Sequence, residues 1–309
     1  MDYYEVLASK ATPVEPEPGE TSYFSEPQAG LDPRLFRNEH IIGHVRQAIL
    51  GVLFTYLKQD YSDPESWATV WLAGSGVSRQ WAAHRNPADL DCLIGIDYIA
   101  FRQANPQYRG FSDQDIASTF NEGFGSVLNK ETDNFMDTYE LTFYVNVRSN
   151  IADIKPYAAY NLTTDDWTIT PATQLPAHMK EWDNKTSRDY SMGVQIINRY
   201  QKALNDISAA QNTAARINAE SALKLAISQG AALFEEIHQG RKAAFSPSGA
   251  GYLDYANYRW QSGKESGIVP ALKKIKEISN ETEKEFNVRT YGVELPDASV
   301  LVRRAITRK

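Results

Sequence analysis

ATVWLAGSG occupies residues 68–76, and DLDCLIGI occupies residues 89–96. The first stretch is an apolar run that ends in glycine and serine, and the second begins with two acids and continues as an apolar run. Short apolar runs bounded by such residues are typical of buried strands. The sequence therefore predicts two strands, with a Gly-Ser loop at the end of the first and an acidic pair at the start of the second.

The acidic pair predicts a metal site. Asp89 and Asp91 are two residues apart in the predicted strand, so their side chains point to the same side. Carboxylates held that close repel each other unless a cation lies between them. Two Mg²⁺ (or Mn²⁺) ions would relieve the repulsion and would bind triphosphate oxygens, activate a hydroxyl and stabilise pyrophosphate. The alternative interpretation is a solvated strand start.

The glycine and serine predict a phosphate contact. Gly74 lets the backbone approach a phosphate closely, and Ser75 offers it a hydroxyl and an N–H. Arg79 and Arg85 follow before the acids, and arginine suits bidentate phosphate contact. A solvated helix face is the alternative for both arginines.

The order of strand, Gly-Ser loop, short helix and Asp89-Leu90-Asp91 resembles the signature of the DNA polymerase beta-like nucleotidyltransferase superfamily, over roughly residues 68–160. The resemblance implies an enzyme that transfers a nucleoside monophosphate from a nucleoside triphosphate, ATP being the expected one, to an acceptor hydroxyl. Pyrophosphate is released. Gly74 and Ser75 would then bind the phosphates, and the two acids would hold the metal ions.

The same resemblance implies a third metal-binding carboxylate on a neighbouring strand. Residues 139–147 alternate as a strand, and residues 151–157 are expected to form its hairpin partner. Asp153, followed by two residues and a proline, is similar to a segment of the oligoadenylate synthase and cyclic-nucleotide synthase branch, so we favour it. Glu140 is the alternative. Lys155 would share a side with Asp153, where it could pair with that acid or contact a phosphate.

The chain divides into three regions by composition and periodicity. Residues 1–31 are acidic and Pro-rich and are expected to form an irregular arm. Residues 32–175 are expected to form the catalytic core, which opens with a helix from Asp32-Pro33 to about Gln59. Residues 176–309 carry apolar stripes at helical spacing. We therefore predict an α/β (α+β) fold, a mixed sheet with packed helices, followed by a helical C-terminal domain.

Two further features of the C-terminal region bear on nucleotide binding. Lys185 and Arg188 begin its first helix, and the resemblance implies that a basic residue near this helix reaches the triphosphate. Tyr252, Tyr255, Tyr258 and Trp260 form a cluster that either stacks on a base or packs between helices.

Composition limits the partners and the location. The 309 residues carry a net charge of −7 and a single cysteine, with no apolar run long enough to span a membrane and no secretory signal. We therefore expect a cytoplasmic enzyme that neither contacts a membrane nor binds a long duplex, which needs a basic face. The expected acceptor is a nucleotide, a nucleic-acid end or a small molecule.

Three rival functions stay open. A toxin or defence enzyme would use the same site to modify RNA ends or protein. A phosphotransferase would use the same loop and acids on the γ-phosphate and release ADP. A binding module would keep the fold without chemistry.

Overall fold

The computed structural model describes residues 3–19, 21–81, 88–171 and 177–292. These residues divide into two compact units. The sheet unit comprises the described parts of Ser22–Pro176 and Phe245–Tyr252, and the helical unit those of Met1–Thr21, Ala177–Ala244 and Leu253–Leu295. The segment Phe245–Tyr252 thus belongs to the sheet unit, although it lies within residues 176–309, which the sequence pattern assigns to the helical C-terminal domain.

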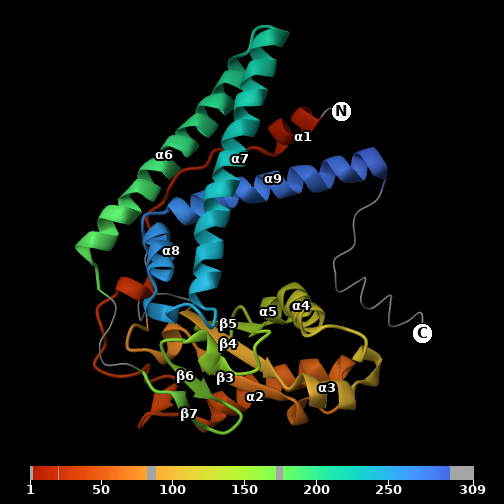
Figure 1. The fold of residues 1–309 in the computed structure, drawn as a ribbon, viewed down its shortest axis with the longest axis vertical. Coiled ribbons are helices and arrows are strands. Elements are labelled where there is room, and N and C mark those ends of the chain that lie inside the picture. Colours follow the sequence, from red (N-terminus) through yellow and green to blue (C-terminus); the bar gives the residue numbers. More distant parts are fainter. Residues whose placement is uncertain (1–2, 20, 82–87, 172–176, 293–309) are drawn as a thin grey trace. The chain divides into compact units, whose positions relative to one another are not determined.

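A five-stranded sheet forms the centre of the sheet unit (Figure 1). Its strand order is β5-β4-β3-β6-β7, and only the β4–β5 pairing is parallel. The strands are β3 (Ala68–Ala73), β4 (Ala88–Ile96), β5 (Tyr139–Val145), β6 (Ala159–Asn161) and β7 (Asp166–Ile169). The strands predicted from residues 68–73 and 89–96 are confirmed, and so is the mixed α/β class.

Helices cover one face of this sheet. They are α2 (Gly43–Asp60), α3 (Tyr98–Ala104), α4 (Asp113–Gly123) and α5 (Asn129–Glu131), with a π-helical turn at Phe124–Leu128. Leu72, Leu90, Cys92 and Phe143 point from the sheet into one core with α2 and α4. Because parallel neighbours need a long crossover, the stretch that carries α3 and α4 is what allows β5 to lie beside β4.

The outer edge of β5 is closed by two asparagine side chains. Asn129 accepts from the N–H of Phe143 at 2.8 Å, and Asn121 accepts from that of Val145 at 2.7 Å. Each amide also donates back to the carbonyl of the same residue. This strand edge is therefore hydrogen-bonded without a further strand.

The helix expected from Asp32-Pro33 is wrong over its first third. Residues 36–41 instead form a small hairpin, β1 (Phe36–Arg37) with β2 (His40–Ile41), whose turn residues have positive φ angles. The Asp32 carboxylate is not a helix cap. It is 1% exposed and accepts hydrogen bonds from Arg34 and from the Tyr139 hydroxyl.

The hairpin expected from residues 139–147 and 151–157 is also wrong. β5 pairs with β4, and Ile151–Ile154 form a single 3-10 turn capped by the Asn150 side chain. Ile151 and Ile154, three residues apart as in one helical turn, are both buried against β3. The chain reaches this turn by crossing β4 at Gly95, where a Cβ would lie 2.2 Å from the Ser149 carbonyl oxygen.

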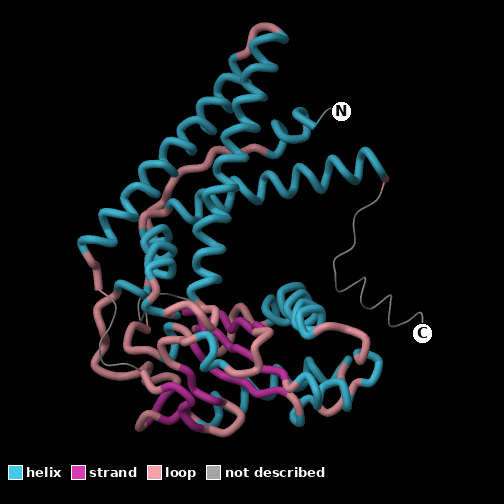
Figure 2. The backbone as a smooth tube through the Cα atoms, viewed as in Figure 1, coloured by secondary structure: helices cyan, strands magenta, loops and turns pink. Residues whose placement is uncertain are grey.

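The helical unit is built from α1 (Tyr3–Lys10), α6 (Lys180–Ala209), α7 (Thr213–Ala244), α8 (Tyr255–Glu265) and α9 (Ile268–Tyr291). The two longest helices, α6 and α7, run side by side as an antiparallel hairpin, and α9 crosses α7 (Figures 1 and 2). Gly230 of α7 lies against α9 at this crossing, where a Cβ would be 3.0 Å from the Ile275 side chain. No described helix has the length and apolar character needed to cross a membrane.

The N-terminal arm is not irregular throughout. Residues 3–10 form α1, because Leu7 is buried in the core of the helical unit and the Tyr3 ring packs edge-on against Phe286 of α9. Lys10 adds an ion pair with Glu285 at 3.1 Å. Proline and acidic content predicted an irregular arm here, but a few buried side chains make residues 3–10 helical.

Candidate functional site

The Gly-Ser loop lies directly against the acidic strand. Ala73, the last residue of β3, is paired with Asp91 in the antiparallel register, so the chain leaves β3 beside that acid. Gly74 has φ 76° and ψ −157°, a conformation that is essentially restricted to glycine. A Cβ at Gly74 would lie 2.3 Å from the Asp91 Oδ2, and a Cβ at Gly76 would lie 2.6 Å from Leu90. Both glycines therefore lie in close contact with side chains of the acidic strand, and the φ angle of Gly74 strains any other residue at that position.

The two predicted acids lie on the face of the sheet opposite the main core. Leu90 and Cys92 alternate with them and are buried on the helix-covered side. Asp89 is half-buried and Asp91 is exposed. Burial and the nearby Asp91 charge raise the pKa of the Cys92 thiol, so the cysteine is a packing residue and not a nucleophile. We call this side of β4 and β5 the acid face.

A third carboxylate joins the acid face from β5. The parallel register pairs Asp89 with Glu140 and Asp91 with Thr142. Directly paired residues of neighbouring strands point to the same face and lie about 5 Å apart. Glu140 is exposed on that face. The acid face therefore carries Asp89, Asp91 and Glu140 side by side.

Asp153, the favoured third acid, does not lie on a strand. It is an exposed residue of the 3-10 turn Ile151–Ile154. Lys155 is not its ion-pair partner, because its Nζ donates to the carbonyl oxygens of Pro247 and Gly249 at 3.2 and 2.5 Å. The hairpin geometry that favoured Asp153 is absent, and the predicted Lys155 phosphate contact is replaced by these bonds.

The chemistry of the acid face fits a hard cation. Its donors are carboxylate oxygens, which Mg²⁺ and Mn²⁺ prefer. Because residue 74 is glycine, no side chain of that residue crowds the Asp91 carboxylate. Among the described residues, no three His, Cys, Asp or Glu side chains already converge on one point. The carboxylates would therefore have to turn toward an ion as it binds.

The residues that follow Gly74 are held firmly from outside the loop. Gln80 is fully buried, and its Nε2 donates to the Tyr23 carbonyl at 2.5 Å. The Tyr252 hydroxyl donates to the Gln80 Oε1 at 3.1 Å, and the Tyr252 ring packs on Tyr23 and Tyr157. A buried amide with satisfied partners fixes its backbone. Local sequence could not identify Gln80, because the partners of its side chain lie 57 and 172 residues away.

The loop also presents polar groups. No described group is hydrogen-bonded to the Ser75 hydroxyl; the Ser75 carbonyl accepts from Ser78. Arg79 is half-buried, and its positive charge partly opposes the rise in the pKa of Tyr157 that burial causes. Arg85 lies outside the described residues. Ser75 and Arg79 therefore lie in the same unit as the acids.

Lys185 and Arg188 lie in the helical unit, on α6. Lys185 pairs with Glu181 at 2.7 Å, and its Nζ lies 5.6 Å from the centre of the Tyr255 ring. Arg188 is exposed. Lys185 and Arg188 therefore belong to a different unit from the Gly-Ser loop and the acids.

The aromatic cluster of residues 252–260 is mainly structural. Tyr252 is packed as described above, and burial raises its pKa. Tyr258 is fully buried, and its hydroxyl donates to Asp183 of α6. Trp260 packs against His238 beneath the Arg241 guanidinium. Packing, the second interpretation from the sequence, accounts for these rings.

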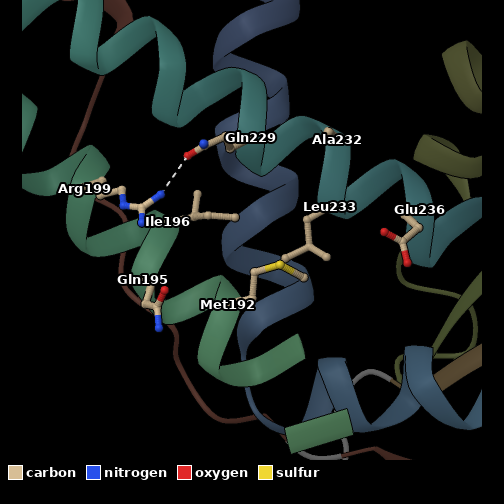
Figure 3. Close-up of a pocket in the computed structure, with 8 residues that line it drawn as sticks. All are labelled: Met192, Gln195, Ile196, Arg199, Gln229, Ala232, Leu233 and Glu236. Carbon is tan, nitrogen blue, oxygen red and sulfur yellow. Dashed lines mark hydrogen bonds between the residues drawn. The ribbon is translucent and has the colours of Figure 1, made fainter. Parts of the chain in front are cut away.

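A groove of about 460 Å³ opens between α6 and α7 (Figure 3). Apolar residues such as Met192 and Leu233 line it together with Arg199, which donates to Gln229 at 3.3 Å. None of its eight lining residues is a predicted site residue. The acid face, and not this groove, is therefore the candidate site that sequence and geometry share.

Comparison of the chain with protein-family models, with curated proteins and with solved structures finds no match in any of the three. The function must therefore be inferred from the residues of the acid face and the Gly-Ser loop.

Proposed function

We propose that the protein is a magnesium-dependent nucleotidyltransferase with a nucleotidyltransferase-type fold. It would transfer a nucleoside monophosphate from a nucleoside triphosphate, with ATP the expected donor, to a hydroxyl acceptor and release pyrophosphate. The observation that carries this proposal is the contact of Gly74 with the Asp91 carboxylate. This contact joins a glycine loop suited to phosphate with a carboxylate suited to a cation.

Each part of the site has a role in the proposal. The backbone at Gly74 and the Ser75 hydroxyl would bind the β- and γ-phosphates, and Arg79 would neutralise part of their charge. Asp89, Asp91 and a third acid would hold the metal ions, and the register favours Glu140 over Asp153 for that third position. When bound, Mg²⁺ would supply the charge that stabilises both the attacking and the leaving oxygens.

The protein's own contribution would be positioning. Asp91 lies between the loop at the end of β3 and the neighbouring strand β5. A triphosphate bound at the loop would therefore present its α-phosphorus over β4. Fixed dipoles and charges at this point need no reorganisation during the reaction, which is where such sites gain most of their rate.

Pyrophosphate release from each nucleoside triphosphate, with Mg²⁺ and a panel of hydroxyl acceptors, tests the proposal. Asp89→Asn and Asp91→Asn should each lower the rate by about 10²–10³-fold or more, as expected for loss of a charge-stabilising group. The exposed Asp133→Asn variant is the matched control and should retain full activity. Wild-type rates in the Asp89 and Asp91 variants, or release of ADP in place of pyrophosphate, would count against nucleotidyl transfer.

A further inference from the structure

An exposed aromatic side chain shares the acid face with the three carboxylates. In β5, Glu140, Thr142 and Tyr144 alternate with buried residues, so all three point to the same side. Tyr144 pairs with Leu93 of β4, two residues beyond Asp91. It is 52% exposed, and it makes no ring contact with another described aromatic. Among the exposed large hydrophobic side chains of the described residues, Tyr144 is the one that lies on the acid face.

The strand order defines two sides of Asp91. The Gly-Ser loop at the end of β3 lies on one side, and β5 lies on the other. In an in-line displacement, the attacking group and the leaving group lie on opposite sides of the phosphorus. If the leaving pyrophosphate is held by the loop, the acceptor must approach over β5, where Thr142 and Tyr144 lie.

The distance between Tyr144 and the acids suits one nucleoside. Two residues along a strand and one strand across put the Cα of Tyr144 about 8 Å from that of Asp91. This span is comparable with the distance from a nucleobase to a sugar hydroxyl of the same nucleoside. A base stacked on the ring would therefore bring a sugar hydroxyl over Asp91 and Glu140.

The strand around Tyr144 is hydrogen-bonded along both edges, which favours a stacking role. Phe143 and Val145, its two neighbours, are hydrogen-bonded on the outer edge by Asn129 and Asn121. On the inner edge the same stretch is paired with β4. Half-buried Leu93 lies beside the ring on the acid face. A ring on a fixed backbone loses little freedom when a ligand binds.

We propose that Tyr144 is the stacking platform for the acceptor's base, and that the acceptor is a nucleoside unit, either a free nucleotide or the end of a single strand. This inference rests on the proposed function, which sets the side from which the acceptor approaches the phosphorus. It assigns the base contact to Tyr144 of β5 and not to the aromatic cluster of residues 252–260.

Saturation-transfer NMR tests the platform without relying on turnover. The titrated probes are AMP and a four-nucleotide oligoadenylate, with Mg²⁺ and a non-hydrolysable α,β-methylene ATP present at saturation to fill the donor site. Tyr144→Ala should weaken binding by about 5- to 150-fold, the range that base stacking on an aromatic ring supports. Tyr144→Phe should bind as the wild type does, because the ring remains. Tyr291→Ala, at an exposed tyrosine of the helical unit, is the matched control and should change nothing.

The outcomes separate the platform from the proposed reaction. Stronger binding of the oligoadenylate than of AMP, lost in Tyr144→Ala, would identify a strand end as the acceptor; the reverse would identify a free nucleotide. Equal binding to the wild type and to a Tyr144→Ala variant of unchanged melting temperature would overturn the platform. Tyr144-dependent binding without pyrophosphate release would support the platform and count against nucleotidyl transfer. Pyrophosphate release with an acceptor that lacks a base, at a rate that Tyr144→Ala does not change, would support nucleotidyl transfer and count against the platform.

Discussion

The Asp91 carboxylate occupies the space that any side chain at Gly74 would need, since a Cβ there would lie 2.3 Å from Oδ2. This contact ties the conformation of the loop to the position of one acid. The loop and the acid must therefore be tested together.

Gly74→Ala should displace the Asp91 carboxylate and strain the loop. The Gly74 conformation costs other residues on the order of 1–3 kcal/mol, so the melting temperature should fall by several degrees and pyrophosphate release should fall further. Gly51→Ala is the control, because no atom lies within 4 Å of its Cβ position and Gly51 is inside α2. That variant should be as stable as the wild type or slightly more stable. A fully active Gly74→Ala enzyme would contradict the loop's assigned role.

Ser75→Ala should affect the nucleotide and not the fold. No described group is hydrogen-bonded to the Ser75 hydroxyl, so the melting temperature should stay unchanged. Loss of one hydroxyl contact to a charged phosphate should cost about 1–3 kcal/mol of triphosphate binding. Calorimetric titration with a non-hydrolysable ATP analogue measures this difference. An unchanged affinity would mean that the Gly-Ser turn is only a structural corner.

The third carboxylate is tested by comparing two conservative variants. Glu140→Gln should reduce turnover far more than Asp153→Asn, because Glu140 is paired with Asp89 in the sheet and Asp153 is on a separate turn. Both acids are exposed, so neither change should alter the melting temperature by more than a degree or two. Steady-state kinetics at saturating Mg²⁺ give the ranking. The opposite ranking would return the third position to Asp153.

The lowered pKa of His238 should make the stability of the helical unit depend on pH. Burial, followed by the charge of Lys242, lowers its pKa from the ordinary 6.5, and Lys276 and Arg241 lower it further while Glu235 opposes them. The unfolded chain then binds more protons below about pH 6.5, so the free energy of unfolding should decrease as the pH falls through this range.

Thermal melts from pH 8 to pH 5 measure this effect. His238→Gln should flatten the decrease, whereas His44→Gln, at an exposed position of α2, should not. An identical pH dependence in the wild type and in His238→Gln would rule out this histidine as the source.

Asp32 should be a stability residue of the sheet unit. Its buried carboxylate accepts hydrogen bonds from Arg34 at 2.6 and 2.9 Å and from the Tyr139 hydroxyl at 3.0 Å. Tyr139 directly precedes Glu140 in β5. Breaking a fully buried pair costs about 3–5 kcal/mol, and the partial exposure of Arg34 lowers the expectation for Asp32→Ala to about 2–3 kcal/mol. Urea denaturation measures it, with Asp133→Ala as the exposed control. A loss of under about 0.5 kcal/mol, the usual surface effect, would contradict this role.

Local pattern was sufficient for the elements that carry the site. The apolar runs at 68–73 and 89–96 form β3 and β4, and the helical stripes after residue 180 form α6, α7 and α9. Gly74, Asp89 and Asp91 could be chosen from the sequence, because their requirements are local: a positive φ angle, and two carboxylates with the period of a strand.

Only the tertiary structure decided which residues lie beside Asp89 and Asp91 on the acid face. Glu140 and Tyr144 reach the acid face through the parallel pairing of β5 with β4, a register set by contacts about 50 residues apart in the chain. Asp153 lies on a turn because Ile151 and Ile154 are buried against β3, a segment distant in the chain. Short-range periodicity cannot distinguish these outcomes, since pairing and burial depend on partners that are distant in sequence.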